Sequence, residues 1–156
     1  MTLEPGDRPR NCEGLLCDGE VFTATSIEEV SEGGALLVFY GFAFSAIAEN
    51  WWRQYDRRGW DDFDVPVVGV GRDGPNAQNA FLRSLDSPFR IYADVDGRLA
   101  EEFGVLARRE NMAGVRIPKR SAFLLDADRT VRASWVLDDW TTPMPASDIE
   151  ETVHGS

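Results

Sequence analysis

The two cysteines of this sequence are its side chains best suited to redox chemistry. Cys12 and Cys17 form a Cys-x4-Cys pair in a glycine-containing segment near the N-terminus. Such a pair could close a small disulfide or exchange electrons with a substrate. Reduced, partly buried thiols are the more common state in a reducing compartment. Neither cysteine lies at the predicted start of a helix, where thiols become reactive, so we favour two inert thiols.

The chain has too few Cys and His residues for a structural zinc site and no well-placed histidine for a Ser-His-Asp triad. Its one histidine, His154, lies close to the C-terminus. A structural zinc site needs four Cys or His ligands close together, and a Ser-His-Asp triad needs a firmly positioned base. A histidine in a terminus that is expected to fray meets neither need. We therefore expect no metal site, no cofactor and no histidine-based catalysis.

A glycine-rich stretch matches a dinucleotide-binding pattern. Gly69, Gly71 and Gly74 have the G-x-G-x-x-G spacing after a predicted strand, and Asp94 follows at about the distance that the pattern requires. The stretch lies in the second strand-helix unit, however, and Pro75 follows it directly. A short glycine motif indicates a nucleotide only within its whole structural context, so nucleotide binding is the minor interpretation.

Aromatic residues gather in two places. Because adjacent residues cannot share one helix face, either Trp51 or Trp52 should line a pocket, a groove or a subunit contact. A second apolar patch at Trp135 and in the range 140–145 would suit a homodimer interface. The first of the two groups, around the adjacent tryptophans, comprises Trp51, Trp52, Tyr55 and Trp60.

Length and charge limit the classes of protein that fit. The 156 residues, 43% of them hydrophobic, are enough for one domain over 1–156 with a core from about 5 to 153. A net charge of −11 argues against nucleic acid as a partner, and acidic residues with a single lysine are expected of a halophilic cytoplasm. The sequence has no long apolar run and no secretory leader pattern, so we expect a cytoplasmic protein without a membrane partner.

Short apolar runs alternate with amphipathic stretches from residue 35 onward, which is typical of an α/β domain. The run 35–40 has no polar position and predicts a central strand that is covered on both faces. The order of elements predicts a thioredoxin-like, three-layer sandwich with a central mixed sheet flanked by helices. The further elements are helices at 45–58, 75–85, 97–103 and 145–153, strands at 65–70 and 89–93, and a hairpin of strands 121–126 and 130–136.

Several short segments occur in one order along about 5–137. They are Gly6-Asp7 with Pro9, the Asp18-Gly19 turn, 39–48, 67–73, 93–97 with 103–105, and 120–126. In this order they resemble the peroxiredoxin (AhpC/TSA, redoxin) family. Arg120 stands three residues before Phe123, where peroxiredoxins have an active-site arginine and thioredoxins a cis-proline. The resemblance therefore implies the peroxiredoxin type of thioredoxin-like fold.

The family has a Pro-x-x-x-Thr/Ser-x-x-Cys turn where this chain has Gly41, Ser45 and Ala48. The resemblance implies that Ser45 orients peroxide, that Arg120 stabilises the thiolate and the leaving oxygen, and that residue 48 is the nucleophile. The methyl group of Ala48 cannot attack oxygen. Gly41 replaces the proline that shields the pocket, and the two losses together favour a naturally degenerate site over an engineered substitution. The residues expected to line the pocket are Phe42, Phe44, Trp51 and Trp52.

The family activity is thioredoxin-dependent peroxide reduction, an antioxidant oxidoreductase reaction, which we expect to be lost or relocated here. The first hypothesis is a non-peroxidase protein that binds a small-molecule ligand or a protein partner, or acts in regulation. The alternative is a thiol-dependent peroxide reductase that uses Cys12 and Cys17. An interaction-only role would gain support if Trp51 or Phe44 filled the pocket above Ala48.

Overall fold

The apolar runs of the sequence form the middle of a mixed seven-stranded sheet in the computed structural model, which describes residues 1–139 and 141–155. The central strands β3, β4 and β5 are parallel to one another, whereas the outer pairs are antiparallel. From edge to edge the strands are β2 (Phe22–Ser26), β1 (Glu13–Cys17), β5 (Arg90–Ala93), β4 (Val67–Gly71), β3 (Ala35–Phe39), β8 (Ser121–Leu125) and β9 (Val131–Val136).

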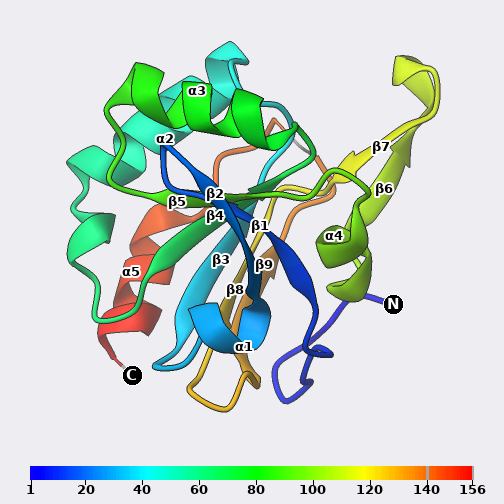
Figure 1. Ribbon diagram of the computed structural model, residues 1–156. Coiled ribbons are helices and arrows are strands. Elements are labelled where there is room, and N and C mark those ends of the chain that lie inside the picture. Colours follow the sequence, from blue (N-terminus) through cyan, green and yellow to red (C-terminus); the bar gives the residue numbers. More distant parts are fainter. Residues whose placement is uncertain (140, 156) are drawn as a thin grey trace.

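Helices cover both faces of this sheet, so the predicted three-layer sandwich is confirmed (Figure 1). All five residues of β3 are buried, as the run without polar positions predicts. Leu36 and Val38 pack into the core on one face, and Leu37 and Phe39 pack into the core on the other. The first face carries α2 (Ala46–Arg57), α3 (Pro75–Leu85) and α5 (Ala146–His154), and the second carries α1 (Ile27–Val30) and α4 (Arg98–Glu102).

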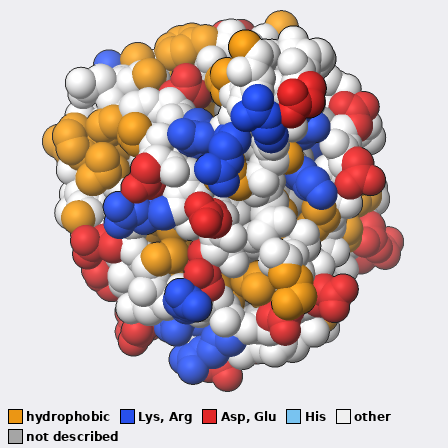
Figure 2. Space-filling view, turned by 90° about the vertical axis from the view of Figure 1, so that its right-hand side faces the viewer, with side chains coloured by type: hydrophobic (Ala, Val, Ile, Leu, Met, Phe, Trp, Pro, Cys, Tyr) orange, Lys and Arg blue, Asp and Glu red, His pale blue; other side chains and the backbone are white. Residues whose placement is uncertain are grey.

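A small separate hairpin that the sequence analysis does not predict projects from the body of the protein (Figure 1). Its strands, β6 (Leu106–Arg109) and β7 (Val115–Pro118), pair only with each other, and the short helix η2 (Glu110–Met112) follows β6. Three of the eight strand residues are exposed and only two are buried, so these strands lack the apolar alternation of a core strand. Figure 2 shows Lys and Arg side chains gathered on this side of the molecule. The net charge of −11 therefore does not describe every face.

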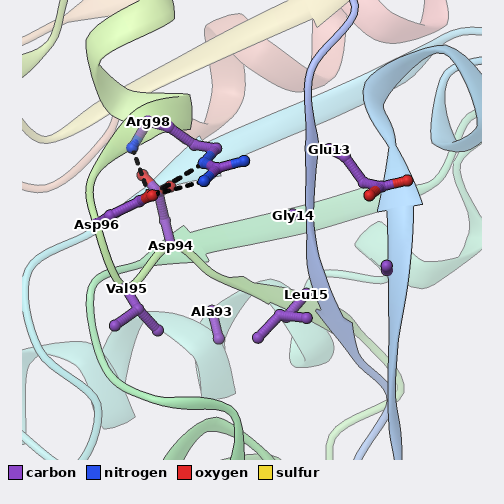
Figure 3. Close-up of a pocket in the computed structure, with 9 residues that line it drawn as sticks. Glu13, Gly14, Leu15, Ala93, Asp94, Val95, Asp96 and Arg98 are labelled. Atoms are coloured by element: carbon purple, nitrogen blue, oxygen red, sulfur yellow. Dashed lines mark hydrogen bonds and ion pairs between the residues drawn. The ribbon is translucent and has the colours of Figure 1, made fainter.

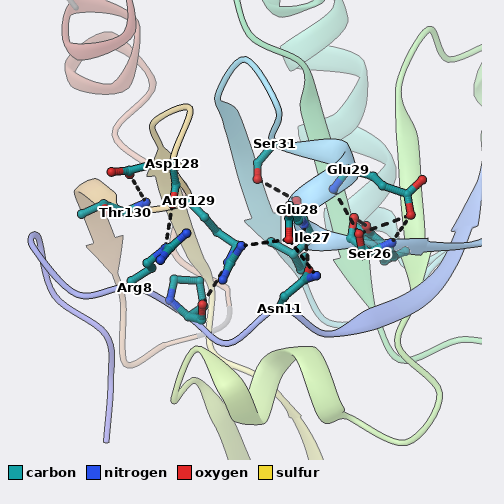
Figure 4. Close-up of polar contacts among 12 residues, drawn as sticks. Arg8, Asn11, Ser26, Ile27, Glu28, Glu29, Ser31, Asp128, Arg129 and Thr130 are labelled. Atoms are coloured by element: carbon teal, nitrogen blue, oxygen red, sulfur yellow. Dashed lines mark hydrogen bonds and ion pairs between the residues drawn. The ribbon is translucent and has the colours of Figure 1, made fainter.

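Polar contacts tie the N-terminal segment to the turn between β8 and β9 and to α1 (Figure 4). The Arg129 guanidinium donates to the Pro9 carbonyl at 3.0 Å, and it lies 3.6 Å from the Glu28 carboxylate. Asn11 donates to the same carboxylate at 3.1 Å, while Arg8 donates to the Asp128 carbonyl at 2.8 Å. These contacts fix the chain that leads into β1.

The C-terminal helix α5 is docked on the protein, which corrects the expectation that His154 lies in a fraying terminus. The His154 ring packs edge-on against Phe63, with 5.4 Å between ring centroids. Glu150 accepts hydrogen bonds from Arg58 and from the indole of Trp60, each at 2.7 Å. Trp60 belongs to the short helix η1 (Trp60–Asp62), so these contacts join α5 to the chain that follows α2. No helix within the described residues is long and apolar enough to cross a bilayer.

Candidate active site

Ser45 is the N-cap of α2, and Ala48 is the third residue of that helix. The Ser45 hydroxyl accepts a hydrogen bond from the Ala48 amide at 3.2 Å and donates to the Phe42 carbonyl at 2.9 Å. An N-cap hydroxyl satisfies one of the amides that a helix start leaves unpaired. The Ala48 side chain is 3% exposed, so its methyl group lies in the core beside the helix start. The structure thus brings Ser45 and Ala48 together, as the motif predicts.

Arg120 contacts the same helix through Trp51 and Tyr55. It stands directly before β8, which pairs with β3, and its Nη1 donates to the carbonyl of Phe39 at the end of β3 at 3.5 Å. Nη2 donates to the Tyr55 hydroxyl, and the guanidinium carbon lies 3.5 Å from the ring centroid of Trp51. The Arg120 side chain is 1% exposed. Burial lowers the pKa of this guanidinium, and its Nε has no hydrogen-bond partner among residues 1–139 and 141–155.

Ala48, Trp51 and Tyr55 lie on one face of α2, because their spacing of three and four residues matches the helix period. Arg120 covers this face through Trp51 and Tyr55, and no hydrogen bond joins it to Ser45 in the described part of the chain. Trp51 and Tyr55 therefore hold the arginine to which the resemblance assigns stabilisation of the thiolate and the leaving oxygen. The sequence analysis did not identify Tyr55 as its partner, although the shared helix face of residues 48, 51 and 55 was a usable signal.

The two adjacent tryptophans are both buried, at 6% exposed for Trp51 and 2% for Trp52. Neither indole is open to solvent, because both pack in the core beneath α2, and the expectation that one of them lines a pocket, a groove or a subunit contact stays a prediction. Trp52 packs against Tyr40 in the core, with 5.7 Å between ring centroids, whereas Trp51 lies beneath the Arg120 guanidinium. Trp51 is thus the tryptophan that lines the site.

Phe44 is the most exposed of the residues expected to line the pocket. Its backbone is left-handed, with φ of 66°, and the residue is 48% exposed. Its ring packs against that of Phe81, with 5.3 Å between the ring centroids. Phe42 is half-buried, and its carbonyl accepts the Ser45 hydroxyl. Gly41 is buried in the same loop. Phe44 therefore lies at the protein surface beside the candidate site, whereas Trp51 is buried within it.

Cys12 and Cys17 point to opposite faces of the sheet. Cys17 belongs to the core on the α2 face, and Cys12 packs against the core on the other face. Five residues of extended chain span roughly 16 Å, whereas a disulfide requires Cα atoms within about 7 Å. Both thiols are free, and the two cannot pair with each other within one chain.

The surroundings of both thiols favour the protonated form. Burial raises the pKa of Cys17 to about 11, and the charge of Asp18 adds to the shift. Burial also raises the pKa of Cys12 to about 11, with further contributions from Glu102 and Asp94. The Cys17 thiol lies 3.7 Å from the Pro75 carbonyl, which is an acceptor and gives a thiolate no stabilisation. These thiols differ from the activated thiolates of redox sites.

Gly69 and Gly71 of the dinucleotide pattern make room for aromatic side chains, and Gly74 is the N-cap of α3. A Cβ atom at Gly69 would lie 2.6 Å from the Trp52 ring, and one at Gly71 would lie 2.8 Å from the Tyr40 ring. The carboxylate of Asp94 accepts the amides of Leu99 and Ala100, both at 3.0 Å, so it holds the start of α4. Core packing and helix capping therefore account for the pattern.

The C-terminal aromatic patch is less exposed than expected. Trp135 is half-buried, and its indole N–H donates to Asp148 of α5 at 2.6 Å. Met144 is buried, and Trp140 lies outside the described residues. The homodimer stays a prediction.

Comparisons with known proteins agree with this architecture. The profile of the AhpC/TSA family matches residues 6–134. A putative peroxiredoxin, bcp, of Coxiella burnetii is 28% identical over 86 residues, which are 54% of this chain and 53% of that protein. The chain thus matches about half the length of this relative.

Solved structures are similar over nearly the whole chain. A peroxiredoxin-like protein from Aquifex aeolicus superposes with a TM-score of 0.83 at 18% identity, covering 99% of this chain and 88% of that one. Enterococcus faecalis AhpC gives 0.80 at 20% identity, covering 99% and 92%. A cysteine-to-serine mutant of Xylella fastidiosa PrxQ gives 0.80 at 19%, covering 99% and 96%. With the profile match over most of its length, the chain belongs to the AhpC/TSA family and has its thioredoxin-like fold.

Proposed function

We propose that this chain is a member of the AhpC/TSA family that does not reduce peroxide at the family site and acts as a binding or regulatory protein. Ala48 carries the proposal. Peroxide reduction transfers one oxygen to a thiolate, which becomes a sulfenic acid while the O–O bond breaks and water or an alcohol leaves. Residue 48 stands at the start of α2, where the helix dipole would favour such a thiolate, and it has no sulfur.

The groups around Ala48 are engaged in structural contacts. The Ser45 hydroxyl is used both as acceptor and as donor within its own helix start. The Arg120 guanidinium lies over Trp51 and binds the Tyr55 hydroxyl, which supports a role in holding α2 against β3. Ala48 and Arg120 are both buried among the described residues, at 3% and 1% exposed. The filled site fits a protein that binds its partner elsewhere on its surface.

The alternative, a thiol-dependent peroxide reductase using Cys12 and Cys17, has no such support. The two thiols lie on opposite faces of the sheet, and both have a raised pKa. A two-cysteine cycle within one chain would need them to form a disulfide after the first oxidation. Their separation along the sequence of β1 counts against that step, because bridging them requires rearrangement of the N-terminal strands.

Peroxide consumption by the full chain tests the proposal. The protein, dithiothreitol and hydrogen peroxide are mixed, and peroxide loss is compared with that caused by the same concentration of free cysteine. We expect no saturable turnover, and no difference between the wild type and the Cys12→Ser and Cys17→Ser variants. Mass spectrometry should show only slow addition of oxygen to the thiols. Fast, saturable turnover that either cysteine variant abolishes would overturn the proposal and establish the alternative.

A further inference from the structure

A groove opens between β1 and the turn that leads from β5 into α4, away from the family site. Residues 15–17 of β1 pair with β5, and Leu15 lies opposite Ala93 at the end of this ladder. Glu13 and Gly14, at the start of β1, pair with β2 alone. The chain after Ala93 leaves the sheet and enters the turn 94–97 before α4. β1 and the 94–97 turn separate at this point, and the cavity between these two segments has a volume of about 320 Å³. We call it the β1–β5 groove.

Small side chains keep the β1–β5 groove open. Leu15 has Ala24 as its neighbour on β2 and Ala93 as its neighbour on β5, and all three line the groove. Residues directly opposite in a sheet point to the same face, so two alanines leave a depression on either side of one leucine. Val95, which is 51% exposed, forms the far wall. Figure 3 shows Leu15, Ala93 and Val95 between β1 and the turn.

Acidic side chains dominate the charge around this apolar floor. Three carboxylates and one guanidinium line the groove. The Arg98 guanidinium donates two hydrogen bonds to Asp96, from Nη2 to Oδ2 at 2.8 Å and from Nε to the same oxygen at 3.0 Å. Asp94 is buried in the wall at the start of α4. The Glu13 side chain is exposed, and its carboxylate forms no hydrogen bond or ion pair with another side chain in the described ranges.

We propose that the β1–β5 groove binds a small primary amine with an apolar body the size of one ring. The volume equals that of roughly ten waters at about 30 Å³ each, and it falls at the lower end of the range for ligand pockets. The body of the ligand would cover Leu15 and Val95. Its ammonium group would face Glu13, the carboxylate at the mouth that has no partner. A carboxylate ligand would meet the same acidic lining and be repelled. The inference is independent of the state of the family site.

A titration of the ¹⁵N-labelled full chain with 2-phenylethylamine, followed by NMR, tests this inference. The matched ligands 2-phenylethanol and 3-phenylpropanoate have the same ring with a neutral and an anionic head group. We expect saturable shift changes at the amides of 13–15, 24 and 93–98. The amine should bind about two- to fivefold more tightly than the alcohol, as for an exposed ion pair, and the carboxylate should not saturate.

Variants separate the groove from the remaining surface. Ala24→Phe fills the floor and should weaken amine binding at least tenfold, whereas Thr23→Phe places the same ring on the opposite face of β2 and should leave it unchanged. Glu13→Gln should remove the preference for the amine over the alcohol, and Glu20→Gln, in the turn between β1 and β2, should not. The proposal is overturned if the amine fails to saturate, if phenylpropanoate binds as tightly, or if folded Ala24→Phe protein binds normally.

Discussion

The guanidinium carbon of Arg120 lies 3.5 Å from the ring centroid of Trp51, and Nη2 of the same arginine donates to Tyr55. Trp51 and Tyr55 follow each other on one face of α2, so a buried cation is held by two aromatic side chains of one helix. No carboxylate forms an ion pair with Arg120 among the described residues. The contact joins the start of β8 to the middle of α2.

We predict that Arg120 and Tyr55 are energetically coupled. Arg120→Met should leave the Tyr55 hydroxyl buried without its partner, and Tyr55→Phe should leave Nη2 of the arginine unpaired, each costing about 1–3 kcal/mol of unfolding free energy. The double variant removes both polar groups and should lose less than the sum, by about 0.5–3 kcal/mol. Urea unfolding followed by tryptophan fluorescence measures this, with exposed Arg116→Met as the control. Strictly additive losses would contradict the coupling.

Ala48→Cys should create a peroxide-reactive thiol. The new sulfur would stand at the start of α2, on the helix face that Arg120 covers, and both the helix dipole and the guanidinium favour a thiolate. In a background of Cys12→Ser and Cys17→Ser, we expect oxidation by hydrogen peroxide faster than that of free cysteine. Adding Tyr55→Phe should raise the rate further, because it frees one N–H of Arg120. If a folded variant is oxidised no faster than free cysteine, Arg120 does not reach the thiol at residue 48.

The buried Cys17 thiol should make the protein less stable in alkali. Its pKa is raised from 9.0 to about 11, so the unfolded chain loses the proton first. The contribution is fully present below pH 9 and is lost as the pH rises toward 11, by at most about 3 kcal/mol at 1.36 kcal/mol per pKa unit. Urea midpoints of the wild type and Cys17→Ala should therefore converge over this range. Parallel curves would show that Cys17 is not the cause.

Gly69→Ala should destabilise the fold, because a Cβ atom there would lie 2.6 Å from the ring of Trp52. Relief of this clash requires displacement of a buried indole, which costs about 1–3 kcal/mol. Gly33→Ala is the matched control, since nothing lies within 4 Å of its Cβ position, and it should change the unfolding free energy by less than about 1 kcal/mol. Equal urea unfolding midpoints for the two variants would contradict the explanation that Gly69 is required by packing against Trp52.

Much of the fold could be predicted because the relevant signals are local. The buried run Ala35–Phe39 and the N-cap spacing of Ser45 and Ala48 depend on backbone periodicity within a few residues. The β6–β7 hairpin was missed because its strands do not contribute an apolar face to the main sheet. Docking of His154 against Phe63 was missed for a related reason, since a terminus gives no local sign of what it packs against.

By itself, the sequence determined the order of the layers, the place of Arg120 before a core strand and an alanine at position 48 near the start of a helix, because each is a property of a residue type at a position in a periodic element. Only the tertiary structure decided what Arg120 touches, since Tyr55 lies 65 residues away along the chain. It also decided that Cys12 and Cys17 face different cores and that a groove opens where β5 leaves β1. These relationships depend on strand register and on the packing of distant elements, which chain-local patterns do not contain.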